Sequence, residues 1–224
     1  MFLNTQYNVD IVACIDATRR MSDHIDKIKE TVLSFHQMIS DELECNGKEI
    51  KQCRVKIIAF RNLGIDDEPM LESRFFEVPE QYDDLKAFLD TIEAKGGTDG
   101  AANALEAIAL ALKSDWNPED IKGRQVVLVF SNSSALPLDT EKNSCLEGLP
   151  RDLEQLSDWW HGVDNSCNSA YLSIKGRMAV FAPNKHPWLE MQAWGRYWQE
   201  CSFYENDVDY DLQNSIHMIA VGAF

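Results

Sequence analysis

The chain has 224 residues, of which 45% are hydrophobic and 26% are charged, a composition typical of a folded globular protein. Its formal net charge of −16 at pH 7 argues against binding to nucleic acid or to an anionic membrane through bulk electrostatics. The length fits one large domain, or one domain with an extension.

The cysteines indicate a reduced protein in the cytoplasm. They are dispersed and form no Cys-x-x-Cys pair, so we expect neither a disulfide framework nor a structural zinc site. The sequence begins without the basic and apolar segments of a secretory signal, and no apolar run reaches membrane-spanning length. The six cysteines are Cys14, Cys45, Cys53, Cys145, Cys167 and Cys201.

An apolar run at residues 9–15 predicts the first strand. Its continuous apolar character is typical of a strand that is buried on both faces of a parallel sheet. A long amphipathic helix should follow, with Ser22 as its N-cap and Asn46-Gly47 at its end. Its apolar side chains recur at steps of three and four, which places them on one face. They are Ile25, Ile28, Val32, Phe35, Ile39 and Leu43.

The middle of the chain continues this alternation of strand and helix. Residues 54–60 predict a second strand, and residues 71–78 a short third strand, antiparallel at the edge of the sheet. A helix should open at Pro79-Glu80. The glycine-rich loop 96–100 precedes an alanine-rich helix at residues 101–114.

The C-terminal half begins with an almost wholly apolar central strand at residues 125–130, which a polar loop follows. The further elements expected are a helix at 152–161, a loop at 162–176, a strand at 177–181, a helix around Trp188 to Trp198, a strand at 201–204 and a helix at 209–220. The alternation predicts an α/β fold with a doubly wound, mostly parallel sheet flanked by helices. We see no internal repeat or linker and predict a single domain over residues 1–224, with a core at about residues 7–138 and a more specialised C-terminal part at residues 139–224.

The tryptophans gather in the C-terminal third and allow two interpretations. The first is packing in the core. The second is an exposed aromatic surface for a protein partner, because tryptophan is enriched at interaction hot spots. The residues concerned are Trp159, Trp160, Trp188, Trp194 and Trp198.

Other chemistry-bearing residues favour structural roles. The histidines are scattered, without a metal-binding spacing. Gly96-Gly97-Thr98 lacks the Gly-Lys-Ser/Thr of a phosphate-binding loop, and Ser133-Ser134 lacks the context of a nucleophile elbow. Cys14 lies inside a predicted strand, so we expect it to pack in the core.

Three loops should converge in the crevice at the carboxyl ends of the parallel strands, where open α/β sheets bind ligands. They are residues 16–21, 96–100 and 131–134. Each supplies oxygen donors of the kind that Mg²⁺ or Mn²⁺ prefers. These donors are Asp16, Thr18, Thr98, Asp99, Ser131 and Asn132.

These motifs resemble those of von Willebrand factor type A (vWA) domains. The metal-ion-dependent adhesion site of that family combines Asp-x-Ser-x-Ser after the first strand, a Thr in a glycine-rich loop and an Asp after the central strand. The likeness is greatest to a bacterial branch with Asp-Ala-Thr-Gly-Ser-Met, Gly-Gly-Gly-Asp and Phe-Thr-Asp. The matching segments here are Asp16-Ala17-Thr18-Arg19-Arg20-Met21, Gly96-Gly97-Thr98-Asp99 with Leu105-Glu106-Ala107-Ile108-Ala109, Phe130-Ser131-Asn132, Leu156-Ser157-Asp158-Trp159-Trp160, Phe181-Ala182-Pro183 and Asp207-Val208-Asp209-Tyr210.

The departures from the family pattern define the central question about the site. Arg20 stands where the second hydroxyl belongs, Arg19 replaces the small residue before it, and Asn132 replaces a carboxylate. Both the added cation and the lost carboxylate lower the affinity for a divalent metal. If Arg20 points inward, its guanidinium can pair with Asp16 and take the place of the ion, and this arrangement, without a bound cofactor, is the one we expect. If Arg20 turns to solvent, Asp16, Thr18, Thr98 and Asp99 can still bind Mg²⁺ or Mn²⁺ weakly.

The resemblance implies a non-enzymatic protein-interaction module, an adaptor or regulator in the bacterial cytoplasm. Related proteins are encoded beside kinases, phosphatases or ATPases in signalling, stress or defence systems, so such a protein is the expected partner. In this hypothesis Arg19 and Arg20 receive a carboxylate or phosphate of the partner, near Ser131 and Asn132. The alternatives are a metal-dependent vWA binding module, an enzyme that uses Asp16 and Asp99, and a purely structural subunit.

Overall fold

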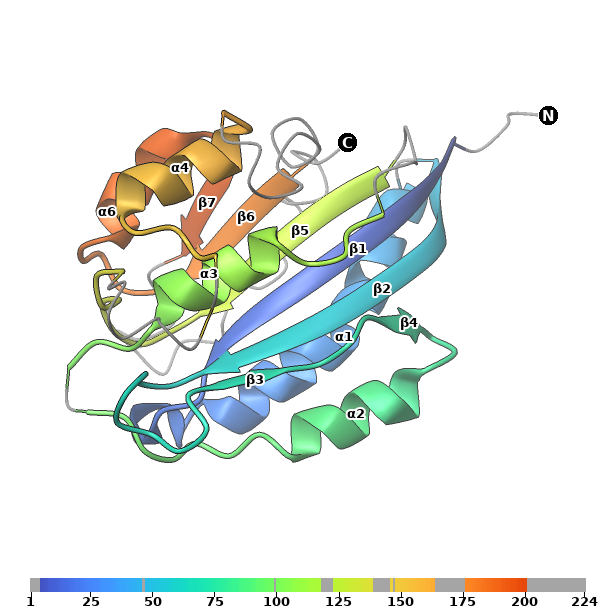
Figure 1. The fold of residues 1–224 in the computed structure, drawn as a ribbon. Helices are drawn as coiled ribbons and strands as arrows, with labels where there is room; N and C mark the ends of the chain where they lie inside the picture. Colours follow the sequence, from blue (N-terminus) through green and yellow to red (C-terminus); the bar gives the residue numbers. More distant parts are fainter. Residues whose placement is uncertain are drawn as a thin grey trace.

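The computed structural model describes residues 5–45, 47–98, 100–117, 123–138, 146, 148–163 and 176–200. Within these residues a seven-stranded sheet has the strand order β3-β2-β1-β5-β6-β7, and β4 pairs with β2 beside β3 (Figure 1). The strands are β1 (Thr5–Asp16), β2 (Lys48–Phe60), β3 (Met70–Glu72), β4 (Phe76–Val78), β5 (Gly123–Phe130), β6 (Gly176–Phe181) and β7 (Tyr197–Glu200).

The strands β2, β1, β5, β6 and β7 follow one another across the sheet, and each is parallel to the next, as the sequence predicts. β1 lies between β2 and β5, so its residue Ile11 pairs with Val55 on one side and with Val126 on the other. This central position explains why residues 11–15 of β1 are continuously apolar.

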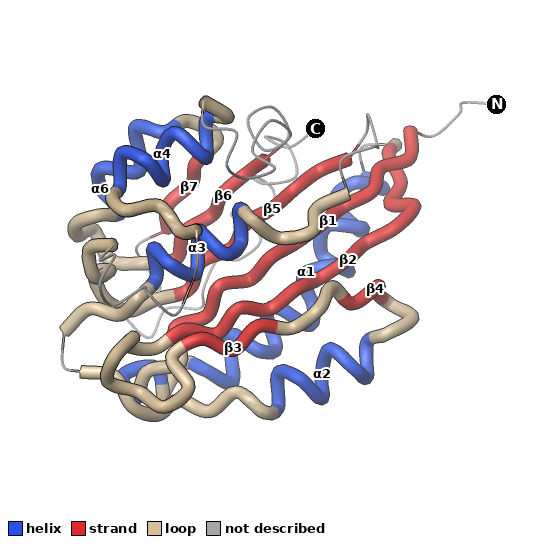
Figure 2. Tube along the Cα trace, in the orientation of Figure 1, coloured by secondary structure: helices blue, strands red, loops and turns tan. Residues whose placement is uncertain are grey.

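Helices cover both faces of the sheet, which confirms the doubly wound architecture (Figure 2). Alternate residues of β1 face opposite layers: Ile11 packs in the first layer and Val12 in the second. The first layer contains α1 (Ile25–Cys45) and α2 (Tyr82–Asp90), and the second contains α3 (Ala104–Leu112), α4 (Leu153–His161) and α6 (Trp188–Met191).

The first helix begins later than the sequence predicts. Residues Arg19–Met21 form a short 3-10 helix, η1, and Ser22 is the C-cap of that helix. α1 therefore starts at Ile25. The predicted apolar stripe is correct, because all six of its side chains are buried.

The predicted strand at residues 71–78 is two strands, β3 and β4, both antiparallel to β2. Ser73 separates them. Its hydroxyl accepts a hydrogen bond from Ile57 N (2.9 Å) and donates one to Arg74 O (2.7 Å). A side chain thus replaces a main-chain partner of β2 and interrupts the ladder.

The helix expected to run to Trp198 ends early. After α6, a 3-10 helix η3 covers Gln192–Trp194, and β7 then begins at Tyr197. Gly195 (φ 68°) and Arg196 (φ 51°) lie between them in positive-φ conformations that no helix continues through. Trp194 and Trp198 consequently pack in different layers instead of sharing a helix face.

The core interpretation of the tryptophans is confirmed. Trp159, Trp160 and Trp188 are at most 1% exposed, and Trp194 is 8% exposed. Trp198 is half-buried. The strand predicted at 201–204, the helix predicted at 209–220 and most of the predicted loop at 162–176 lie outside the described residues.

Cys14 packs in the core as predicted. Its thiol is fully buried and donates to Ala107 O at 3.5 Å. Burial raises the pKa of this thiol, so it stays protonated. Within the described residues, no helix combines the length and the apolar character needed to cross a bilayer.

A buried ion pair ties the middle of β1 to β2. Arg54 donates from Nε and Nη2 to the two carboxylate oxygens of Asp10, at 2.7 and 2.6 Å, and its guanidinium stacks on Phe75 at 4.5 Å. The Asp10 side chain is only 5% exposed, and Asn117 N also donates to it. Loss of the arginine would leave a buried carboxylate without its counter-charge.

Arg54→Ala should therefore lower the free energy of unfolding by roughly 3–5 kcal/mol, the usual cost of breaking a buried pair. Arg74→Ala is the matched control, because Arg74 also pairs with an aspartate (Asp84) and stacks on a phenylalanine, but its pair is exposed. The control should cost about 1 kcal/mol or less. Urea denaturation measures both; equal losses would contradict the assignment.

Candidate functional site

The structure brings the three predicted loops together at the carboxyl edge of the sheet, near the tips of β1 and β2 (Figure 1). Arg19 N donates to Gly96 O at 3.1 Å, which joins the first loop to the glycine-rich loop. The side-chain amide of Asn132 donates to Arg20 O at 2.7 Å, which joins the first loop to the third.

Asp16 is the centre of this arrangement. It is the last residue of β1 and its side chain is fully buried. Oδ1 accepts hydrogen bonds from Thr18 N (2.9 Å) and Thr18 Oγ1 (2.7 Å), and Oδ2 accepts one from Ser131 Oγ (2.8 Å). Burial raises the pKa of this carboxyl, while these bonds and the charge of Arg20 act in the opposite direction.

Arg20 lies in the site but does not pair with Asp16. Its Nη2 donates to Ser133 Oγ at 2.9 Å, and among the described contacts it has no hydrogen bond or ion pair to the carboxylate. Thr18 donates to one Asp16 oxygen and Ser131 to the other. Arg20 still acts on Asp16 through its charge, whereas Arg19 is exposed to solvent.

Asn132 links the third loop to the first. Its amide nitrogen donates a hydrogen bond to Arg20 O. Its Oδ1 is buried and accepts no hydrogen bond from any described group. Arg20 Nε is buried in the same way, without an acceptor in the described part of the chain. The third loop therefore holds the backbone of η1 and the Arg20 side chain at once.

Thr98 makes its described hydrogen bonds outside the Asp16 cluster. Its side chain is exposed, and its hydroxyl lies 3.4 Å from both Asn62 Nδ2 and Gly100 N, which donate to it. No described contact links it to Thr18 or Asp16. The predicted donor Asp99 lies outside the described residues.

Two glycines make the close approach of the loops feasible. Gly96 (φ 66°) and Gly97 (φ 72°) have left-handed backbones. A Cβ on Gly97 would lie 2.6 Å from Thr18 Cγ2, and one on Gly96 would lie 2.0 Å from Asp66 Oδ1. The absence of side chains here lets the glycine-rich loop touch both Thr18 and Asp66.

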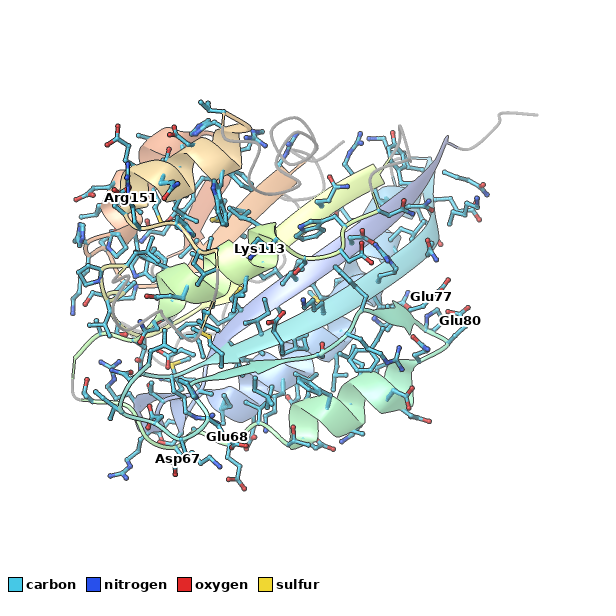
Figure 3. All side chains as sticks on the ribbon, in the orientation of Figure 1. Asp67, Glu68, Glu77, Glu80, Lys113 and Arg151 are labelled. Carbon is cyan, nitrogen blue, oxygen red and sulfur yellow. The ribbon has the colours of Figure 1, made fainter. Side chains whose placement is uncertain are left out.

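A fourth loop, after β2, belongs to the site although the sequence analysis missed it. Asp66 accepts hydrogen bonds from Asn62 N (2.9 Å) and Gly97 N (3.0 Å). Its neighbours Asp67 and Glu68 lie at the same end of the molecule (Figure 3). The available signal was the position of Arg61 and Asn62 directly after an apolar strand, as Asp16 follows β1.

Arg61 connects these loops in the protein interior. It is 2% exposed, and its guanidinium donates to three carbonyl oxygens: Ala17 (3.1 Å), Glu68 (2.7 Å) and Glu93 (2.9 Å). One buried cation thus holds the first loop, the loop after β2 and the segment after α2 in fixed relative positions.

The described donors fit a divalent cation poorly. Asp16 already accepts hydrogen bonds on both oxygens, Thr98 is turned to Asn62, and Arg20 adds a positive charge. Among the described residues no group of three or more histidine, cysteine or carboxylate side chains has a metal-binding arrangement. A cation would have to displace hydrogen bonds that the protein makes internally.

Comparison with solved structures identifies the fold. A von Willebrand factor type A protein from Catenulispora acidiphila superposes with a TM-score of 0.55 and 11% identity, over 97% of this chain and 43% of that chain. The pilus adhesin SpaC from Lactobacillus rhamnosus GG superposes with a TM-score of 0.53 and 10% identity, over 98% of this chain and 31% of that chain. The open conformation of SpaC superposes with a TM-score of 0.50 and 12% identity, over 98% of this chain and 30% of that chain.

This chain therefore has the vWA fold and spans less than half the length of those chains. No protein-family model matches the sequence, and no curated protein matches it. The structural likeness confirms the fold that the sequence motifs predict. At such low identity it concerns the fold alone.

Gly97→Ala should distort the contact between the first two loops, because the new methyl group would overlap Thr18. Gly47→Ala is the matched control: Gly47 has a similar φ of 68° but open space around its Cβ position. The control should cost about 1 kcal/mol for its backbone conformation, and Gly97→Ala roughly 1–3 kcal/mol more for the overlap.

Urea denaturation gives both free energies of unfolding, and amide NMR shifts of Thr18 and Arg19 report on the loop itself. Equal losses for the two variants, with unchanged Thr18 and Arg19 shifts, would contradict this packing.

Proposed function

We propose that this chain is a non-enzymatic protein-interaction module that binds an acidic group of its partner at the carboxyl-edge site without a divalent metal. The observation that carries the proposal is the placement of Arg20, which Ser133 holds beside the fully buried Asp16. The neighbouring Arg19 is exposed to solvent. The rim of the site thus offers cationic donors where the resemblance would place a metal ion.

The chemistry of these residues favours a carboxylate or phosphate ligand. A guanidinium presents planar N–H donors that match two oxygens of such a group. Arg19 is free to reach outward, while Arg20 is preorganised by its bond to Ser133. Preorganisation lowers the entropy that binding costs.

A role in binding rather than catalysis agrees with the surroundings of the site. Ser133 donates to the carbonyl of Ser134 and accepts from Arg20, so it has no general base among its described partners. Both oxygens of Asp16 accept hydrogen bonds within the protein, and the carboxylate is shielded from solvent. Two of the compared structures are pilus adhesins by name, and adhesion is a binding function.

The cellular setting that we propose is a signalling, stress or defence system of the bacterial cytoplasm, with a kinase, phosphatase or ATPase as the partner. This part of the proposal rests on the resemblance of the sequence motifs. The main alternative is a vWA module that binds its partner through Mg²⁺ or Mn²⁺, with Asp16, Thr18, Thr98 and Asp99 as ligands.

Arg19→Gln/Arg20→Gln should abolish partner capture. The tagged double variant and the tagged natural chain are used to enrich proteins from the native cell, which mass spectrometry then quantifies. The control Arg74→Gln/Arg151→Gln makes the same change in net charge at exposed arginines away from the site. Partners recovered equally by both double variants would overturn the role of the rim arginines.

Metal dependence is tested by restoring the family pattern. The natural chain should gain no thermal stability from Mn²⁺, because its site already satisfies Asp16 internally. Arg20→Ser/Asn132→Asp should gain up to about 2.7 kcal/mol at a Mn²⁺ concentration one hundred times its dissociation constant. Calorimetric unfolding with and without Mn²⁺ measures this gain; stabilisation of the natural chain would instead favour the metal-dependent alternative.

A further inference from the structure

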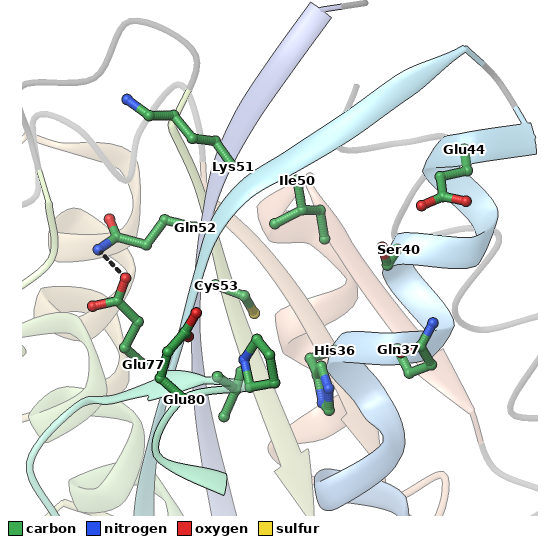
Figure 4. Close-up of a pocket in the computed structure, with 12 residues that line it drawn as sticks. His36, Gln37, Ser40, Glu44, Ile50, Lys51, Gln52, Cys53, Glu77 and Glu80 are labelled. Carbon is green, nitrogen blue, oxygen red and sulfur yellow. Dashed lines mark hydrogen bonds between the residues drawn. The ribbon is translucent and has the colours of Figure 1, made fainter.

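A groove of about 370 Å³ lies beside the first half of β2, away from the carboxyl-edge loops (Figure 4). It is bounded by α1, by β2 and by the corner between β4 and α2. Glu77 and Glu80 of this corner lie at the opposite end of the molecule from Asp67 and Glu68 (Figure 3). The groove is therefore separate from the site at Asp16.

The walls of the groove carry more acceptors than donors. Three carboxylates line it, those of Glu44, Glu77 and Glu80, against the single ammonium group of Lys51. Gln52 donates from its amide nitrogen to Glu77 Oε1 at 2.9 Å, which leaves the amide oxygen of Gln52 as a further acceptor. Such a wall favours a ligand that only donates hydrogen bonds.

His36 adds another acceptor. Its Nδ1 lies 3.1 Å from Leu33 O, and because a carbonyl only accepts, Nδ1 carries the proton in the neutral ring. Nε2 is then the acceptor of the ring, on a side chain that lines the groove. Burial lowers the pKa of His36, which keeps the ring neutral at pH 7.

The floor of the groove is apolar. Ile50, Val78 and Pro79 line it together with Cys53, which is 4% exposed and points its sulfur from β2 toward α1. The Cys53 thiol makes no hydrogen bond with any described residue. An aliphatic chain can lie on this floor without displacing a hydrogen bond of the protein.

We infer that this groove binds an arginine- or lysine-bearing segment of a partner protein. These side chains combine a methylene stem, which suits the apolar floor, with a cationic head that only donates hydrogen bonds. Glu77 and Glu80 at the rim meet the head, and His36 Nε2 accepts from it on the opposite wall. Charge and hydrogen-bond direction therefore both match a cationic side chain.

The neighbouring strand edge favours a protein segment over a small amine. In the part of the chain that the structure describes, β4 pairs with β2 only at residues 53–55. The outer edge of residues 48–52 is thus available to the main chain of an extended segment. Lys51 has no partner in the pairing of β2 with β1, and such a bulge makes a strand locally irregular, so the cationic side chain makes the principal contact.

The test uses NMR titration of the full chain with a capped tri-arginine peptide, observed at the imidazole resonances. The His36 signals should shift and saturate, while those of the exposed His186, which pairs with Glu190 far from the groove, should stay constant. A capped tri-glutamate peptide should cause no shift. Absence of a saturable His36 shift would overturn the inference.

Glu77→Gln/Glu80→Gln should weaken tri-arginine binding by roughly tenfold, as expected for about 1.4 kcal/mol of lost interaction. The control Glu30→Gln/Glu154→Gln makes the same charge change at exposed glutamates outside the groove. If the control weakens binding equally, the peptide responds only to the overall negative charge and the groove site is overturned. Spermidine that binds at least as tightly as the peptide would overturn the assignment to a protein segment.

Discussion

The carboxyl-edge site depends on the buried guanidinium of Arg61. Its rigid fork of N–H donors reaches the carbonyls of Ala17, Glu68 and Glu93 at once, which a single ammonium group on a flexible stem cannot do with the same fixed angles. Ala17 O accepts from Arg61, and the next amide along the chain, Thr18 N, donates to Asp16. The position of the central carboxylate is therefore linked to Arg61 through one peptide unit.

The sequence predicts most of the described fold because burial imposes a period on it. β1, α1 and β5 are apolar in the pattern that their neighbours require, so their existence and order follow from the sequence. The predicted elements are wrong where a single residue changes the local backbone against the hydrophobic pattern. Ser73 replaces a main-chain partner of β2, and Arg196 adopts a positive φ that glycine usually takes, so neither effect is visible in hydrophobic periodicity.

The positions of the site loops were also predictable, because strand ends in a parallel sheet share one edge. The choice of hydrogen-bond partners was not. Asp16, Arg20 and Thr98 each had several feasible partners, and the outcome depends on distances that spacing does not encode. In the structure Thr18 and Ser131 donate to Asp16. Arg20 donates to Ser133, and Asn62, which the sequence did not single out, donates to Thr98.

The net charge of −16 acts differently on the two proposed binding surfaces. An acidic partner that approaches Arg19 is repelled by the chain as a whole until it comes within about one Debye length, about 8 Å at physiological salt, of the arginine. Its affinity must then come from close, partly desolvated contacts, and added salt should speed its association. A basic partner that approaches Glu77 and Glu80 is attracted from a distance, so salt should slow its association. Opposite salt dependences of the association rate therefore distinguish the two surfaces, even where a single partner carries both kinds of charge.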